Sequence, residues 1–213
     1  MKYQYIAIEG PIGVGKTTLA KKLATSISGR YLADSDVINP YLKGFYQQPD
    51  RVAFHTQMHF LVSRLETLEV ANLDKETRPV VADFMFDKDR LFAELTLDET
   101  EWQMYDAVFQ RSVQNLVKPD LVIYLQAPLE RLMQRIERRG IKHEQRMESR
   151  YLQRLIELYE RFFHQYDASP LLIVNAAEIN LADSPADFEM LIERIRSVDG
   201  GRHYVNPIAS ASA

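Results

Sequence analysis

The sequence predicts an α/β fold in which five parallel strands form a sheet that helices cover on both faces. Short apolar segments alternate along the chain with longer segments whose apolar residues recur at spacings of three and four. The short segments are typical of strands buried on both sides, and the longer ones of amphipathic helices. Such alternation favours parallel strands joined by crossover helices. No internal repeat or linker is present, so we expect one domain, residues 1–199, and a loosely ordered tail, residues 200–213.

The expected strands are marked by apolar runs that contain many β-branched residues. They cover residues 2–8, 30–33, 78–84, 121–125 and 171–175. The third begins next to a proline, a residue that a strand tolerates at its start. The fourth, LVIYL, and the fifth, LLIVN, are almost wholly apolar, as central strands of a parallel sheet should be.

The expected helices are marked by the helical spacing of their apolar residues and by proline, aspartate or glycine at their ends. They cover residues 16–26, 39–46, 49–74, 87–95, 98–117, 128–140, a segment that includes 152–162, and 185–198. The spacing is clearest in the third helix, with Phe54, Met58, Leu61, Leu65 and Leu68. Pro119 lies beyond the end of the fifth helix, and Gly140 ends the sixth.

The composition excludes several functional classes. A formal net charge of −4 gives no electrostatic footprint for nucleic acid. The absence of cysteine excludes disulfides, thiolate zinc sites and cysteine nucleophiles. The N-terminus enters the first expected strand at once, and no apolar run approaches the length of a membrane span. We therefore expect a cytoplasmic protein that binds neither nucleic acid nor a membrane.

The strongest motif is GPIGVGKT, which matches the phosphate-binding loop (P-loop) pattern G-x4-G-K-[ST] between an expected strand and an expected helix. Its glycines let backbone N–H groups turn toward phosphate oxygens, and the following helix directs its positive end to the same place. Lys16 is expected to reach the β- and γ-phosphates of ATP, and Thr17 to offer its hydroxyl to a Mg²⁺ ion that arrives with ATP. The predicted ATP-binding residues of the loop are Gly10, Pro11, Ile12, Gly13, Val14, Gly15, Lys16, Thr17 and Thr18.

A P-loop alone does not decide between GTPases, motor and transport ATPases, and kinases. A switch GTPase also needs the patterns D-x-x-G and N-K-x-D, and neither occurs in these 213 residues. A chain of this size fits a kinase for a small acceptor molecule. Four arginines crowd the helix before Gly140: Arg131, Arg135, Arg138 and Arg139. They indicate either a solvated basic face or a lid that closes over phosphates.

From about residue 5 to residue 175, the chain resembles the deoxynucleoside kinases, and most closely their small bacterial members. The resemblance is carried, in order, by IEGPIGVGKTT, FYQQPDRVAFHTQMHFLVSRL, VVADFMFDKDRLFA, ETEWQMY, DLVIYLQAPLERLMQRIERRG and the HEQ that follows. It implies a five-stranded parallel sheet, a homodimer formed through helices, and phosphate transfer from ATP to the 5′-hydroxyl of a deoxynucleoside. The many apolar residues of the helical segments 57–74 and 98–117 also favour a homodimer.

The resemblance also implies roles for single residues. Asp83, at the carboxyl end of the third strand, matches the general base, and the lid arginines match Arg135 and Arg139. Together with Lys16 these form the predicted catalytic set. The expected acceptor-binding residues are Asp83 itself, Asp34 near the 5′-hydroxyl, Tyr46 at the 3′-hydroxyl, Gln57, Arg64 and Asp89 at the edge of the base, Phe92 stacked on it, and Glu144 at the sugar.

Blander interpretations of the same residues stay open at this point. Gln57 and Arg64 lie seven apart and could form a solvated helix face, and Asp89 could belong to a charge cluster at a helix start. Tyr46 and Phe92 could be core aromatics. Asp36 competes with Asp34 for its role.

Two positions depart from the family pattern. Phe84 replaces the arginine that follows the general base in the animal enzymes. Ile141 stands where another lid arginine is common, with Lys142 or Arg146 as substitutes.

The leading hypothesis is an ATP-dependent kinase of purine deoxynucleosides, with deoxyguanosine ahead of deoxyadenosine. Its alternatives are a deoxyadenosine/deoxycytidine kinase, a nucleoside monophosphate kinase of thymidylate-kinase type, and a non-catalytic nucleotide sensor.

Overall fold

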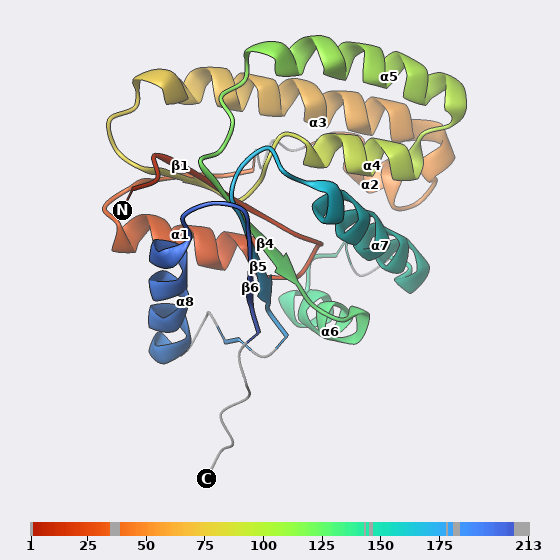
Figure 1. The fold of residues 1–213 in the computed structure, drawn as a ribbon. Coiled ribbons are helices and arrows are strands. Elements are labelled where there is room, and N and C mark those ends of the chain that lie inside the picture. The colour runs from red at the N-terminus through yellow and green to blue at the C-terminus, as the bar shows by residue number, and fades with distance from the viewer. Residues whose placement is uncertain are drawn as a thin grey trace.

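The computed structural model describes residues 2–34, 39–142, 144, 147–177, 179–180 and 184–206. A parallel sheet with strand order β2-β3-β1-β4-β5-β6 runs through its centre (Figure 1). The strands are β1 (Tyr5–Glu9), β2 (Arg30–Leu32), β3 (Val80–Ala82), β4 (Leu121–Gln126), β5 (Leu171–Asn175) and β6 (Arg202–Val205). Every neighbouring pair is parallel. The predicted α/β class with a parallel sheet is therefore confirmed.

The predicted count of five strands is wrong, because the sheet has a sixth strand in the segment expected to be tail. β6 pairs with β5 from Arg202↔Leu171 to Val205↔Val174. The sequence of β6, RHYV, contains no apolar run that could predict a strand, and Val205 is its only buried residue. The guanidinium of Arg202 donates to the carbonyls of Phe163, His164 and Tyr166, and these contacts fix the edge strand.

The helices alternate with the strands as predicted. They are α1 (Lys16–Ser26), α2 (Leu42–Phe45), α3 (Pro49–Ala71), α4 (Lys88–Thr96), α5 (Glu99–Ser112), α6 (Leu129–Arg139), α7 (Ser149–Gln165) and α8 (Pro185–Ser197). α3 ends earlier than expected because Asn72 adopts a left-handed conformation with φ of 49°. α5 begins at a capping box in which Asp98 and Glu101 bond each other's backbone N–H groups.

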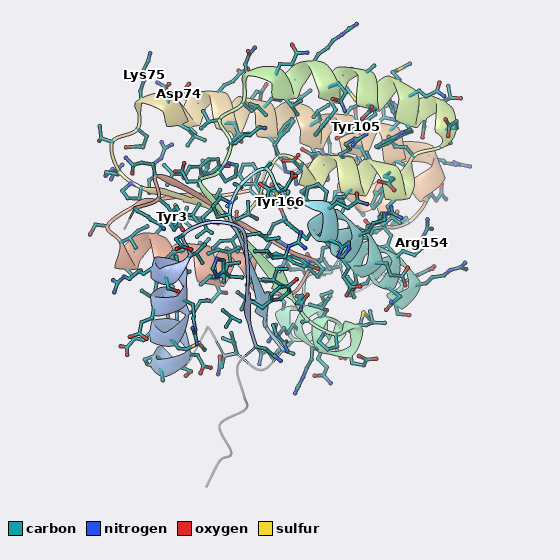
Figure 2. The ribbon with its side chains drawn as sticks, viewed as in Figure 1. Tyr3, Asp74, Lys75, Tyr105, Arg154 and Tyr166 are labelled. Carbon is teal, nitrogen blue, oxygen red and sulfur yellow. The ribbon has the colours of Figure 1, made fainter. Side chains whose placement is uncertain are left out.

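The helices form layers on the two faces of the sheet. α3, α4 and α5 lie together on one side, and α1 and α8 lie on the opposite side (Figure 1). Alternation along β3 separates the two apolar cores, since Val80 and Ala82 join the core under α3–α5 while Val81 joins the other. In Figure 2, Tyr105 lies in the α3–α5 layer and Tyr3 near α1 and α8. This three-layer arrangement leaves the carboxyl ends of the strands together at one end of the sheet, where ligands bind in open α/β folds.

Candidate active site

The loop between β1 and α1 has the backbone conformation of a phosphate cradle. Gly10 and Gly13 have φ of 150° and 83°, which L side chains rarely adopt. A Cβ atom on Gly10 would lie 2.3 Å from the carbonyl oxygen of Leu125, so β4 leaves no room for a side chain there. Gly10 is therefore required by the turn and by its close approach to the sheet, and Gly13 by the turn.

Lys16 folds back over this loop. Its Nζ donates to the carbonyl oxygens of Gly10 at 2.7 Å and Pro11 at 3.2 Å. The pKa of Lys16 is lowered to about 8, chiefly by burial and also by Lys88, although Glu9 has the opposite effect. A phosphate at the loop would stabilise the charged form of Lys16.

Asp83 follows β3 and faces the P-loop. Its Oδ2 accepts hydrogen bonds from Thr17 Oγ1 at 2.5 Å and from the Tyr31 hydroxyl at 2.8 Å. Its Oδ1 accepts from the backbone N–H of Asp34 at 2.5 Å. The carboxylate is 4% exposed, and its three donors come from α1, β2 and the segment after β2. Asp83 therefore lies at the carboxyl end of β3, as predicted. Its three hydrogen bonds hold the carboxylate beside the hydroxyl of Thr17, the predicted metal ligand.

The P-loop and Asp83 line one cavity of about 490 Å³. Its ionisable lining side chains are Lys16, Asp34, Asp83, Lys88, Arg135, Arg138, Arg139 and Glu144. Five of these are cationic and three are acidic, so the cavity suits an anion. The volume is in the range of pockets that hold small ligands.

A largely buried network of four charges adjoins this cavity, and two of its members, Asp34 and Lys88, line the cavity wall. Arg64 of α3 donates to both oxygens of Asp34, from Nε at 2.7 Å and Nη2 at 3.1 Å. Its Nη1 donates to Asp89, and Lys88 donates to Asp34. Arg64 is 4% exposed, so its interpretation as part of a solvated helix face is wrong. Asp89 does lie in the first turn of α4 beside Lys88, but it is 1% exposed and pairs with Arg64. The exposed cation beside them, Arg90, instead pairs with Asp106.

The network shifts the pKa values of Asp34, Arg64 and Asp89 in different directions. Burial would raise the pKa of Asp34, but Arg64 and Lys88 outweigh it and hold this pKa below its ordinary value. Burial would lower the pKa of Arg64, but Asp34 and Asp89 hold it above its ordinary value. The pKa of Asp89 is raised to about 6, because the effect of burial outweighs the opposing effect of Arg64. Asp89 is therefore the acid of the network that takes up a proton most readily.

Three further predicted acceptor residues, Gln57, Tyr46 and Phe92, have contacts of their own. Gln57 of α3 is 2% exposed, which also rules out a solvated face there, and its Nε2 donates to Thr96 Oγ1 at 3.1 Å. Burial raises the pKa of Tyr46, and nearby Glu144 adds to this effect. Phe92 packs edge-on to Tyr159, with ring centroids 6.5 Å apart, and the Lys88 Nζ lies 5.9 Å from the centre of its ring.

The predicted lid arginines have defined partners. Arg135 of α6 donates to the carbonyls of Val14 at 3.1 Å and Ala176 at 2.8 Å, which ties α6 to the P-loop. Arg139 donates to Glu144 Oε1 at 2.7 Å. The interpretation as a purely solvated basic face does not account for these contacts. Asp36 and Arg146, named above as alternatives, lie outside the described residues.

Three residues that the sequence analysis did not assign belong to this region. Glu9, at the end of β1, is fully buried and accepts from Gly10 N at 2.8 Å, Met85 N at 3.0 Å and the Tyr159 hydroxyl at 2.9 Å. Tyr31 orients Asp83, and Lys88 lines the cavity. Only Glu9 had a usable signal, an acid at the last position of an apolar strand directly before the P-loop.

Transfer of a phosphoryl group depends on positioning and charge stabilisation more than on covalent chemistry by the protein. The cavity brings a lysine-bearing P-loop, a fixed carboxylate and several cations to one end of a parallel sheet. The class of protein defined by this fold and cavity is a P-loop phosphotransferase. No helix in the described part of the chain is long and apolar enough to cross a membrane.

Comparison with known proteins narrows the class. The deoxynucleoside kinase family model matches residues 6–198, and the chain belongs to this family. It is 35% identical over 200 residues to a deoxyguanosine kinase of Bacillus subtilis (strain 168), covering 91% of this chain and 97% of the relative. A deoxyadenosine/deoxycytidine kinase of the same organism is 28% identical over 205 residues, with 92% and 94% covered.

A solved structure has the same fold. The structure of deoxyadenosine kinase from M. mycoides with bound dATP superposes with a TM-score of 0.79 and 25% sequence identity, covering 91% of this chain and all of that one. The protein is therefore an enzyme that phosphorylates a deoxynucleoside, and the alternatives of a monophosphate kinase and a non-catalytic sensor are set aside.

Proposed function

We propose that this enzyme transfers the γ-phosphoryl group of ATP to the 5′-hydroxyl of a purine deoxynucleoside and prefers deoxyguanosine to deoxyadenosine. We assign the activity to one kinase domain, which comprises the predicted residues 1–199 and the edge strand β6 (Arg202–Val205). The observation that carries the proposal is the position of Asp83, whose carboxylate lines the cavity and accepts a hydrogen bond at 2.5 Å from the P-loop hydroxyl of Thr17.

In the proposed reaction, Asp83 is the general base. It accepts the proton of the 5′-hydroxyl as that oxygen attacks the γ-phosphorus. The bond between the γ-phosphorus and the bridging oxygen breaks, its electron pair stays on the β-phosphate, and ADP leaves. Lys16 and the lid residues Arg135 and Arg139 bind the phosphates and offset the charge that develops in transfer. The hydrogen bonds from Thr17 and Tyr31 orient the base before substrate arrives.

The oxygen donors at this site fit Mg²⁺ that arrives with ATP. The Thr17 hydroxyl and the Asp83 carboxylate are hard ligands of the kind that Mg²⁺ prefers. Within the described ranges, no group of three or more histidine, cysteine or acidic side chains could hold a metal. Thr17 would therefore hold the ion together with phosphate oxygens and water, and the ion would supply positive charge at the β- and γ-phosphates.

The preference for a purine rests on two buried acceptor atoms. Asp89 Oδ2 and Gln57 Oε1 have no hydrogen-bond partner within the described residues. An unpartnered buried acceptor is costly, and donors from a ligand would satisfy it. Guanine offers adjacent N1–H and N2–H₂ donors that suit a carboxylate, whereas thymine has a single ring N–H. Because Arg64 is committed to Asp34 and Asp89, we assign the reading of the base to Asp89 and Gln57, with Arg64 holding Asp89 in place.

The sugar and the base plane have candidate partners as well. We propose that Tyr46 and Glu144 contact the sugar hydroxyls, and that Phe92 stacks on the base. Glu144 Oε2 is buried and has no partner in the described part of the chain, so a sugar hydroxyl would satisfy it. Asp34 remains our candidate near the 5′-hydroxyl, since it lines the cavity with Asp83.

The proposed enzyme is a homodimer. On the surface of α3, Val70 is 84% exposed and Val62 46%, and Met104 on the neighbouring α5 is 59% exposed. Large apolar side chains at such exposure on adjoining helices favour burial against a second copy.

The experiment that tests the substrate class measures kcat/KM for the four natural deoxynucleosides with Mg²⁺-ATP, with their monophosphates as controls. We expect deoxyguanosine to lead, then deoxyadenosine. Deoxycytidine in first place would favour the deoxyadenosine/deoxycytidine alternative, in keeping with the 28% identical relative of that name. Thymidine in first place would contradict the base site assigned above.

A further inference from the structure

Lys88 is a buried cation that the proposed mechanism has not yet used. It is the first residue of α4, five positions after Asp83, and it is 7% exposed. Lysine is almost never fully buried unless it is paired, and Lys88 is paired with Asp34. The pair lies at the wall of the cavity that also contains Lys16, Thr17 and Asp83.

Asp34 does not need Lys88 to satisfy its hydrogen bonds. The guanidinium of Arg64 already forms a fork to both Asp34 oxygens, at 2.7 and 3.1 Å. An ammonium group has three N–H donors, and Asp34 accepts only from one of them. Lys88 can therefore turn donors toward the cavity while Asp34 keeps a charged partner.

The second ammonium in the cavity repels the first. The side chains of Lys16 and Lys88 line the same cavity. Two ammonium groups that face one cavity destabilise each other unless an anion lies between them. The anion that the P-loop is built to hold there is a phosphate of ATP.

We propose that Lys88 donates a hydrogen bond to an oxygen of the γ-phosphate of ATP, opposite Lys16, and stabilises the phosphoryl group as it moves to the acceptor. This inference rests on the proposed function. Lys88 takes no proton in the step: the proton of the 5′-hydroxyl goes to Asp83 and the electron pair of the broken bond to the β-phosphate. Lys88 offsets the negative charge that accumulates on the oxygens of the phosphoryl group during its transfer.

A binding experiment without any acceptor tests the contact. Calorimetry of the full chain with Mg²⁺ gives the affinities for ADP and for the β,γ-imido analogue of ATP, which differ at the γ-phosphate. Lys88→Met should lower the ratio of analogue affinity to ADP affinity on the order of tenfold, the range of one charge-assisted hydrogen bond. Lys88→Arg keeps the charge and the pairing to Asp34, and should keep the ratio within about threefold of wild type.

Arg90→Met is the matched control, because Arg90 lies on the same helix, is exposed and pairs with Asp106 on the surface. It should leave the ratio unchanged. If Lys88→Met weakened ADP and the analogue equally, or neither of them, Lys88 would serve only to hold Asp34 and the proposal would be overturned. If Lys88→Met does not fold, Lys88→Gln takes its place, since it also removes the charge. A ratio that falls on the order of tenfold in Lys88→Gln supports the contact, and a ratio unchanged from wild type overturns the proposal.

Turnover gives a second readout. With the preferred deoxynucleoside, Lys88→Met should lower kcat on the order of 10²-fold while the KM of the acceptor changes little. A rise in the acceptor KM with kcat unchanged would place Lys88 at the acceptor and contradict the γ-phosphate contact. If wild type phosphorylates no deoxynucleoside at all, the proposed function fails, and the binding ratio still decides the role of Lys88.

Discussion

Replacing Arg64 by methionine should destabilise the folded chain strongly. The arginine side chain is 5% exposed, and it forms a salt bridge with Asp89, whose side chain is 1% exposed. Removing one member of a buried ion pair leaves the other charge uncompensated, which costs about 3–5 kcal/mol. For a domain of this size, each kcal/mol lowers Tm by about 2–4 °C, so we expect a fall of about 6–20 °C. Asp34 is less affected, because Lys88 stays beside it.

Thermal unfolding followed by circular dichroism at neutral pH measures this effect. The matched control is Arg90→Met, which removes an arginine whose side chain is 47% exposed and which should cost about 0–1 kcal/mol. The double variant Arg64→Met with Asp89→Asn should recover part of the loss, since the stranded carboxylate is gone. A single variant that melts within about 2 °C of wild type would refute the reasoning, and so would a double variant less stable than the single one.

Further predictions concern chemistry, pH and assembly. Asp83→Asn should still bind ATP but lose on the order of 10²-fold or more in turnover, and near-normal turnover would place the base elsewhere. Lys16→Ala should weaken both ATP binding in calorimetry and turnover, and an unchanged affinity would contradict its phosphate contact. The pKa of Asp89 is about 6 in the folded chain and roughly 3.9 in an unfolded one. Wild type should therefore lose stability relative to Asp89→Asn as the pH rises from about 4 to about 6, measured by urea titration. An equal pH dependence of stability in both proteins would exclude the raised pKa of Asp89. Light scattering should give the mass of two chains, and a monomer at micromolar concentration would contradict the dimer.

The sequence predicts the P-loop well because the function of the loop lies in its backbone. Only glycine tolerates the φ of 150° and the approach of Leu125 at position 10, so the conformation determines the residue type. Asp83 is equally accessible to prediction, since the end of a buried parallel strand has a known place in the fold. In both cases local pattern and position in the sheet are sufficient.

The partners of the charged residues could not be predicted in the same way. Arg64 and Asp89 come from helices α3 and α4, and their pairing depends on how these helices pack on the sheet. The sequence places Asp34 near the acceptor but gives no sign that Arg64 and Lys88 both bind it. The edge strand β6 was missed for a related reason, because its pairing with β5 and not an apolar run makes it a strand.

Glu9 links the P-loop to the segment that carries Asp83. Its carboxylate is fully buried, and burial of such a group requires hydrogen-bond donors. These donors are the first N–H of the P-loop, the N–H of Met85 two residues after Asp83, and the hydroxyl of Tyr159 on α7. The carboxylate also counteracts the effect of burial on the pKa of Lys16. One acid at the end of β1 thus fixes the distance between the phosphate cradle and the segment that carries the base, and it helps to keep the P-loop lysine charged for the phosphate that it binds.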